Sequence, residues 1–352
     1  MSEPCRDGNA ACSPAASSAR RVHWGVLGCA QIARRCLIPA LNRSRNGVIR
    51  ALASRSRERS RSLAQEYGIP VAYGSYEELL EDPEVEAVYI PLPNHLHREW
   101  ALCVIEAGKH VLCEKPLATN AQDAQIMVQA ARGRDLLLME AFMYRFHPRS
   151  RRVKSLIDQG AIGDLWLVRS SFCFRHPDPT DIRFRPQMGG GALLDVGCYG
   201  VSLARWLLGT EPETVQACAE FGPSGVDTTL VGLLRFPGAR LAVVEASFTS
   251  ALQQTFTVVG TEGAIELPQD AFIPWEKDAW FRLRGVDEEE GCVEVVPGAD
   301  EYQLMVEHFA DAVLGKVDLE PSPEESVENM RVLDALARAA REGHAVKVIG
   351  EW

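Results

Sequence analysis

Long apolar runs are missing from this sequence, and so are the cysteine and charge patterns that mark several classes of protein. No run approaches the roughly 20 apolar residues that a helix needs to span a bilayer. The ten cysteines form no CxxC pair and no metal-ligand spacing, which favours reduced thiols in a cytoplasmic protein over a disulfide framework or a metal site. The net charge of −11 disfavours nucleic acid and anionic membranes as partners, because both would repel the chain.

The first residues also lack the features of a targeting segment. Residues 1–21 are rich in Ala and Ser, with neither an apolar core nor a basic start. We interpret them as a disordered tail rather than a signal peptide. The rest of the chain exceeds what one hydrophobic core usually supports, which predicts two domains, at 22–146 and 147–352.

Short apolar runs alternate with helical patterns in the first of these domains. Strands separated by helices of this length predict a doubly wound parallel sheet, the Rossmann arrangement of α/β proteins. A capping box, from Thr119 to Gln122, opens one of the helices. The predicted strands are 22–28, 48–54, 85–93, 110–116 and 135–140, and the predicted helices include 30–44, 57–68 and 96–108.

The first strand–helix turn reads GCAQIA and matches the dinucleotide pattern G-x-G-x-x-G only in part, because Ala30 and Ala33 stand at two glycine positions. An ordinary tight turn before a helix looks similar. Its place favours a pyrophosphate site, since free N–H groups and the helix dipole can hold phosphate there. The predicted contacts are Gly28, Cys29, Ala30, Gln31 and Ile32.

The end of the second strand indicates which dinucleotide is bound. NAD-binding domains usually place an acid there, whereas this chain reads ASRSRERSRS, with Ser54, Arg55 and Arg59. A hydroxyl and guanidinium groups suit a 2′-phosphate, so we expect NADP. The alternative is a solvated basic start of a helix.

Four segments resemble one family over nearly the whole chain. GCAQIA, PLPNHLH, AGKHVLCEKPLA and GGGALLDVGCYG are similar to the glucose–fructose oxidoreductase, inositol dehydrogenase and MocA (Gfo/Idh/MocA) oxidoreductases. EAFMYRFHP and a tyrosine at 199, where many relatives have histidine, resemble the branch of dimeric dihydrodiol dehydrogenases, NADP-dependent D-xylose dehydrogenases and keto-sugar reductases. The resemblance implies an NADP-dependent oxidoreductase acting on a sugar or polyol.

The resemblance also implies that Lys115 and Tyr199 face the nicotinamide from opposite domains. Tyr199 would be the general acid/base, and Lys115 would lower its pKa and polarise the substrate oxygen. In such families the bond between Lys115 and Pro116 is often cis. Asp195 lies four residues before Tyr199, which predicts one shared helical face. Asp195 would bind a substrate hydroxyl or hold the lysine, although an acid early in a helix is also ordinary.

Other polar residues are weaker candidates. Asn94 and His97 follow the strand at 85–93, the usual place of the cofactor crevice, although His97 could equally be a core histidine. Asp181 and Arg183 could contact sugar hydroxyls or form a surface salt bridge. The predicted cofactor contacts also include Pro91, Leu92, Glu114 and Lys115, and the predicted substrate contacts are Tyr144, Arg145, Asp181, Arg183, Asp195 and Tyr199.

The second half combines helices with strand patterns joined by short turns, which predicts an α+β domain with an antiparallel meander. The resemblance implies a large open sheet whose outer face forms a homodimer or higher oligomer. The leading functional prediction is aldose oxidation of the D-xylose 1-dehydrogenase type. The alternatives are a 3-keto nucleotide-sugar reductase, a trans-dihydrodiol dehydrogenase and, from another class, a glycosidase that transfers hydride internally.

Overall fold

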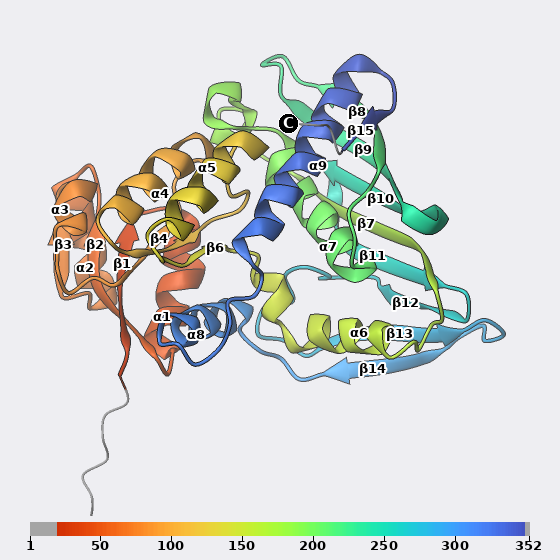
Figure 1. Cartoon of the computed structure of the whole chain (residues 1–352), viewed down its shortest axis with the longest axis horizontal. Helices are drawn as coiled ribbons and strands as arrows, with labels where there is room; N and C mark the ends of the chain where they lie inside the picture. Colours follow the sequence, from red (N-terminus) through yellow and green to blue (C-terminus); the bar gives the residue numbers. More distant parts are fainter. Residues whose placement is uncertain (1–19, 349–352) are drawn as a thin grey trace, which may run out of the picture.

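The computed structural model describes residues 20–348. Two sheets with helices around them make up the chain, the first at the left of Figure 1 and the second at the right. Nearly all of the predicted tail lies outside the described residues. Between Arg20 and Val348, no helix is both long and apolar enough to cross a membrane.

The first sheet has six strands in the order β3-β2-β1-β4-β5-β6. All neighbours run parallel, and the strand order reverses between β1 and β4, where dinucleotides bind in such sheets. The predicted Rossmann arrangement is confirmed, with β3 added. The strands are β1 (Val22–Leu27), β2 (Gly47–Ala53), β3 (Val71–Tyr73), β4 (Ala87–Ile90), β5 (His110–Cys113) and β6 (Leu138–Glu140).

The helices of this half begin and end at recognisable caps. Ser56 accepts from the N–H of Arg59 at the start of α2, and Gly68, with φ of 68°, ends it. The capping box predicted from Thr119 was wrong, because Asn120 caps α5 by accepting from the N–H of Asp123. The helical elements are η1 (Ala33–Leu37), α1 (Ile38–Arg43), α2 (Arg57–Tyr67), α3 (Tyr76–Leu80), η2 (Asn94–Leu96), α4 (His97–Glu106), α5 (Ala121–Arg132) and η3 (Met143–Phe146).

The second sheet has nine strands in the order β14-β13-β12-β11-β7-β10-β9-β8-β15. The expected antiparallel pairing holds except between β7 and β10, which run parallel, because β7 inserts between two later groups of strands. The strands are β7 (Leu165–Arg175), β8 (Thr214–Phe221), β9 (Asp227–Phe236), β10 (Arg240–Ser247), β11 (Thr249–Gly260), β12 (Gly263–Leu267), β13 (Ala279–Gly285), β14 (Cys292–Val296) and β15 (Val346–Lys347).

The helices of the second half cover one face of this sheet and reach the first domain. α6 packs on β13, α7 on β7 and β10, and α9 on β8; α9 also packs against α5 and so links the two halves (Figure 1). Pro323 begins α9, and the Ser322 side chain before it makes no capping hydrogen bond. These elements are α6 (Pro148–Asp158), η4 (Ile182–Phe184), η5 (Pro186–Met188), η6 (Leu193–Gly197), α7 (Cys198–Leu208), η7 (Pro237–Ala239), α8 (Glu301–Val313) and α9 (Pro323–Glu342).

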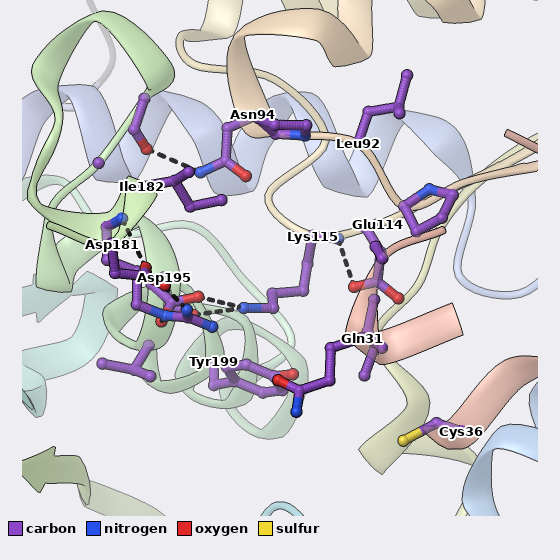
Figure 2. Close-up of a pocket in the computed structure, with 18 of the residues that line it drawn as sticks. Gln31, Cys36, Leu92, Asn94, Glu114, Lys115, Asp181, Ile182, Asp195 and Tyr199 are labelled. Carbon is purple, nitrogen blue, oxygen red and sulfur yellow. Dashed lines mark hydrogen bonds and ion pairs between the residues drawn. The ribbon is translucent and has the colours of Figure 1, made fainter. Parts of the chain in front are cut away.

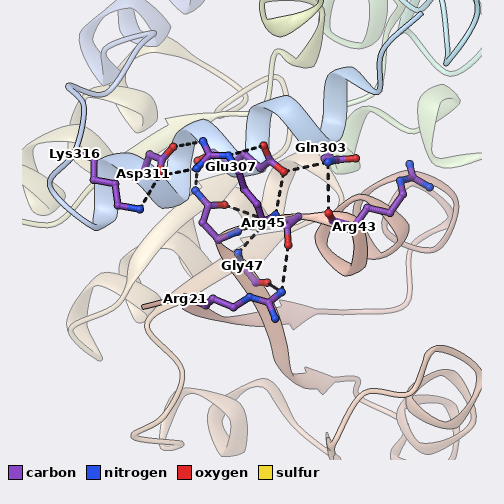
Figure 3. Close-up of polar contacts among 10 residues, drawn as sticks. Arg21, Arg43, Arg45, Gly47, Gln303, Glu307, Asp311 and Lys316 are labelled. Atoms are coloured by element: carbon purple, nitrogen blue, oxygen red, sulfur yellow. Dashed lines mark hydrogen bonds and ion pairs between the residues drawn. The ribbon is translucent and has the colours of Figure 1, made fainter. Parts of the chain in front are cut away.

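α8 follows β14 of the second sheet in the chain but packs against α1 and β2 of the first domain. The ring of Phe309 lies 5.3 Å from that of Trp24 on β1. Polar contacts add to this packing (Figure 3): Arg45 pairs with Glu307 at 3.1 Å and also with Asp311. Residues 301–313 therefore belong to the core of the first domain, and the predicted boundary at residue 146 stays a prediction.

Candidate active site

A cavity of about 570 Å³ lies between the two domains, at the carboxyl ends of β1, β4 and β5. Segments from both domains line it, as Figure 2 shows. Many of the predicted cofactor and substrate residues come together here, whereas their roles stay predictions. They are Ala30, Gln31, Ile32, Pro91, Leu92, Asn94, Glu114, Lys115, Asp181, Arg183, Asp195 and Tyr199.

Two contacts join the domains across this cavity (Figure 2). Lys115 Nζ donates to Asp195 Oδ1 at 2.9 Å and to the Asp195 backbone oxygen at 2.7 Å. Asn94 Nδ2 donates to the backbone oxygen of Gly189 at 2.8 Å. The peptide bond between Lys115 and Pro116 is cis.

Asp195 is held by two cations. Its Oδ2 accepts from Arg183 Nε at 2.7 Å, and Arg183 Nη1 also donates to Asp181 Oδ1 at 3.1 Å. Burial alone would raise the pKa of Asp195, but Lys115 and Arg183 hold it well below its usual range. Of the two predicted roles for this carboxylate, the geometry matches the one that holds the lysine.

The charge of Lys115 depends on this pairing. Burial alone would lower its pKa, whereas the Asp195 carboxylate, with Cys198 and Glu114, more than offsets that effect and raises it. Two of its three N–H donors are used by Asp195, which leaves one for a substrate oxygen.

Tyr199 lies beside Lys115 but its environment differs from the prediction. Its ring centroid is 5.2 Å from Lys115 Nζ, and its hydroxyl donates to Met143 Sδ at 3.6 Å. Burial raises the pKa of Tyr199 well above its usual value. The expectation that Lys115 lowers this pKa was wrong, because the phenol is desolvated and Asp195 balances the lysine charge.

The segment that carries Asp195 and Tyr199 begins as a π-helical turn, η6, and continues as α7. Such turns widen the helix and are frequent at functional sites. Both residues line the cavity, so the predicted shared face is found although the helix is not a regular α-helix there.

A second cavity, of about 620 Å³, lies beyond the first strand–helix turn. Gly28 at that turn has φ of 90°, which favours glycine. Arg57 points elsewhere and pairs with Glu78 at 2.6 Å. Glu66, which also lines the cavity, pairs with Arg34 at 3.4 Å. The predicted residues in this cavity are Gly28, Cys29, Ser54, Arg55 and Arg59.

Three predicted site residues line neither cavity. The two ring nitrogens of His97, fully buried, lie 2.9 Å from the Pro116 oxygen and 2.7 Å from the Leu92 oxygen. His97 therefore supports the loops that carry site residues, as its alternative interpretation as a core histidine allowed.

The other two, Tyr144 and Arg145, were predicted as substrate contacts, and the structure corrects both. The hydroxyl of Tyr144, fully buried, lies 2.9 Å from Ser202 Oγ. Arg145 pairs with Glu325 at 2.7 Å and stacks over Trp206. Their place at the domain junction suggested the cavity, but their side chains are used for packing.

The sequence did not predict several of the residues that line the cavity. Tyr302, at the start of α8, reaches the cavity from a segment more than 100 residues after Tyr199 and lies against Cys36. No local pattern in the sequence signals such a long-range approach. Six other unpredicted lining residues form an apolar wall: Phe172, Phe174, Ile182, Met188, Ile273 and Trp275.

Two protein families match the two halves of the chain. "Oxidoreductase family, NAD-binding Rossmann fold" matches residues 22–142, and "GFO/IDH/MocA C-terminal domain" matches residues 150–266. The chain belongs to the Gfo/Idh/MocA oxidoreductase family. The family predicted from the sequence motifs is thereby confirmed, and so is the expected class of enzyme, an oxidoreductase.

Relatives in the Gfo/Idh/MocA family span most of the chain. A "D-xylose 1-dehydrogenase (NADP(+)) 2" from Haloferax volcanii is 40% identical over 92% of this chain and 99% of its own. A human "trans-1,2-dihydrobenzene-1,2-diol dehydrogenase" is 38% identical over 72% of this chain and 77% of its own.

Solved structures of the family superpose closely. A 3-ketoreductase from Actinomadura kijaniata, in complex with NADP and TDP-benzene, has a TM-score of 0.85 at 33% identity and covers 91% of this chain and 98% of its own. Three structures of that protein carry single substitutions, two of the same lysine and one of a tyrosine. These two positions are as far apart in that chain as Lys115 and Tyr199 are here.

Proposed function

We propose that this chain is an NADP(H)-dependent oxidoreductase that moves a hydride between the nicotinamide and a carbon of a sugar or polyol, with aldose oxidation at C1 as its main reaction. One observation carries this proposal: the ion pair of Lys115 and Asp195 stands beside Tyr199, in the cavity that adjoins the dinucleotide turn. The NADP-dependent D-xylose 1-dehydrogenase that matches most of the chain supports it.

The residues present fit NADP. Gly28 leaves the backbone of the first turn open to a pyrophosphate, and the helix that follows supplies free N–H groups. Ser54, Arg55 and Arg59 in the second cavity suit a 2′-phosphate. The expectation of NADP agrees with the cofactor of the Haloferax and Actinomadura relatives.

When bound, NADP supplies or accepts the hydride. Lys115 donates its remaining N–H to the substrate oxygen and stabilises negative charge there. Asp195 keeps Lys115 protonated by offsetting the cost of its burial. Tyr199 holds the proton that joins or leaves that oxygen, and the apolar wall excludes water from the reacting atoms.

A second candidate is the reduction of a keto-sugar. The raised pKa of Tyr199 keeps its hydroxyl protonated at neutral pH, which suits donation of a proton to a carbonyl oxygen. The 3-ketoreductase from Actinomadura kijaniata supports this direction.

A substrate panel separates the two candidates. We would follow reduced-cofactor absorbance with aldoses and dihydrodiols in the presence of NADP, and with keto-sugars in the presence of NADPH. Turnover of aldoses with NADP supports the leading proposal, and turnover of keto-sugars alone supports the second. Turnover of glycosides without net change in NADP would instead support a hydride-transfer glycosidase.

We also propose a homodimer in the cytoplasm. The face of the second sheet opposite α6, α7 and α9 exposes Val231 and Leu233, at 46% and 40%, and apolar sheet faces favour burial. The eight cysteines within the described residues are free thiols, which suits a reducing compartment.

A further inference from the structure

A buried carboxylate faces the start of the helical segment that carries Asp195 and Tyr199. Asp227, the first residue of β9, accepts a hydrogen bond from the Leu193 N–H through Oδ2 at 2.6 Å. The N–H of Ala192 also points to it. Gly191, with φ of 119°, lies so close that a Cβ there would overlap Asp227 Oδ1. The last glycine of the GGG triplet therefore leaves space for this carboxylate.

The first N–H groups of any helix have no partner within the helix. A carboxylate from elsewhere in the fold can satisfy them, and its charge also interacts favourably with the helix dipole. Here the capped turn is the one that contains Asp195, and Tyr199 follows one turn later. The position of this turn fixes how the Asp195 carboxylate meets Lys115.

We propose that Asp227 is a positioning residue that caps this helix from β9 and so holds Asp195 against Lys115 and Tyr199 in the cavity. The proposal rests on the function proposed above, because it assigns Asp227 a part in turnover. Asp227 does not line the cavity and acts only through the helix that it caps.

The cap depends on the ionisation of Asp227. Burial raises the pKa of Asp227 to about 6, against the opposing effect of the N–H groups and of Arg341 on α9, which faces it. At neutral pH the carboxylate is therefore charged, and the charge strengthens its hydrogen bonds to the N–H groups of the helix start.

A matched control exists in the same chain. Asp334 on α9 accepts from the Ala121 N–H at 2.8 Å and so caps α5 from a distant helix, and burial raises its pKa as well. Among the described residues, none of α5 lines either cavity. Asp227→Ala and Asp334→Ala therefore remove equivalent caps, and only the first affects a helix that carries site residues.

We would measure kcat, the KM of the sugar and the Kd of NADP for both variants at pH 7, with thermal unfolding as the measure of stability. Asp227→Ala should lower kcat about tenfold and change the Kd of NADP less than twofold. Asp334→Ala should lose similar stability and keep the kcat of the wild type. Equal kcat losses in the two variants would overturn the proposal.

A second readout does not need turnover. When Asp195 moves away, burial lowers the pKa of Lys115 and makes its amine more reactive. Labelling of Lys115 by an amine-reactive ester, followed by peptide mass spectrometry, should therefore increase in Asp227→Ala and not in Asp334→Ala. If the wild type oxidises no sugar but this labelling changes as stated, the proposed function fails and the positioning role stands. Unchanged labelling would refute the positioning role.

Should Asp227→Ala not fold, Asp227→Ser keeps a capping oxygen without the charge. It should show the same changes in kcat and in labelling to a smaller extent, and wild-type values in both would overturn the proposal.

Discussion

Lys115 Nζ lies 2.9 Å from Asp195 Oδ1, and this ion pair connects the loop after β5 in the first domain to the helix that begins with η6 in the second. Both side chains are largely buried, at 15% and 18% exposure. The pair therefore sets the charge of the lysine and also the relative position of the two walls of the cavity.

Asp195→Asn should lower the pH at which activity is lost on the alkaline side. Lys115 must be charged to donate to a substrate oxygen. Burial lowers its pKa, whereas Asp195, together with Cys198 and Glu114, raises it. Without the carboxylate that pKa decreases, so the alkaline limb of kcat/KM moves to lower pH. Loss of a hydrogen bond between charged groups should also reduce kcat/KM at neutral pH by roughly tenfold to hundredfold.

A pH profile of kcat/KM checks this, with Asp181→Asn as the control. Asp181 contacts Arg183 but makes no contact with Lys115, so its variant should keep the alkaline limb in place. An unshifted limb in Asp195→Asn would mean that Asp195 does not control the lysine.

Arg55→Ala should weaken the binding of NADP about tenfold and leave the binding of NAD nearly unchanged. A charge-assisted hydrogen bond is worth about 1.5–3 kcal/mol, and an open site with a neighbouring Arg59 should lie near the lower end. Arg55→Asp should do more, because it repels the 2′-phosphate. Added salt should reduce the preference of the wild type for NADP.

Titration of both cofactors checks this, and Arg57→Ala is the matched control. Arg57 belongs to the same basic run but pairs with Glu78 outside the cavity, so its removal should leave both affinities unchanged. If Arg55→Ala weakened the binding of NADP and of NAD equally, the basic residues after β2 would be only a solvated surface.

Asp311→Asn should reduce the free energy of unfolding by about 1 kcal/mol at pH 7, a modest value because its partner Arg45 is 60% exposed. Burial would raise the pKa of Asp311, but hydrogen bonds from Arg45, Asn46 and Lys316 lower it to about 2. A lowered carboxyl pKa stabilises the fold above the ordinary pKa near 4, and this contribution is lost as the pH falls through about 2.

Urea unfolding of the wild type and Asp311→Asn at several pH values checks this. The difference in the free energy of unfolding between the wild type and the variant should decrease from pH 4 to pH 2. Asp158→Asn, which removes the exposed pair with Lys154, should show a smaller difference throughout. A difference that stays constant down to pH 2 would contradict the role of the network in Figure 3.

Val231→Glu should convert the proposed dimer to a monomer. Val231 lies on the uncovered face of the second sheet, next to Glu245 in the register of β9 and β10, so a second carboxylate would place like charges at the interface. Sedimentation velocity at micromolar concentration measures the change. Val286→Glu, at a valine that is 71% exposed on the β13–β14 connection, should remain a dimer. A monomeric wild type would contradict the proposal.

Much of the first domain could be predicted from sequence because its strands and helices are long and periodic, and because the turn at Gly28 and the segment around Lys115 are local motifs. β3 was missed because three half-buried residues carry no clear pattern. The strands β12 to β14 were missed because their pairing is determined by tertiary contacts. The sequence also predicted a helix cap at Thr119, whereas the adjacent Asn120 makes the capping hydrogen bond.

The site was predicted less completely, for a physical reason. Sequence motifs identified Lys115 and Tyr199, but burial is a property of the whole fold. Burial raises the pKa of Tyr199, whereas the sequence led us to expect a lowered pKa. Tyr144 sits in a matching motif, yet its side chain points to Ser202 rather than to the cavity. Tyr302 lies on α8, and no local sequence pattern predicts that α8 packs on the first domain.

The kcat of aldose oxidation by Tyr199→Phe tests the central claim most directly. The wild type should reduce NADP with an aldose, and Tyr199→Phe should lower kcat by roughly two to four orders of magnitude while the Kd of NADP stays the same. Tyr144→Phe, which removes a buried hydroxyl outside the cavity, should retain most of the activity. Near-wild-type turnover by Tyr199→Phe across the pH range would contradict the account.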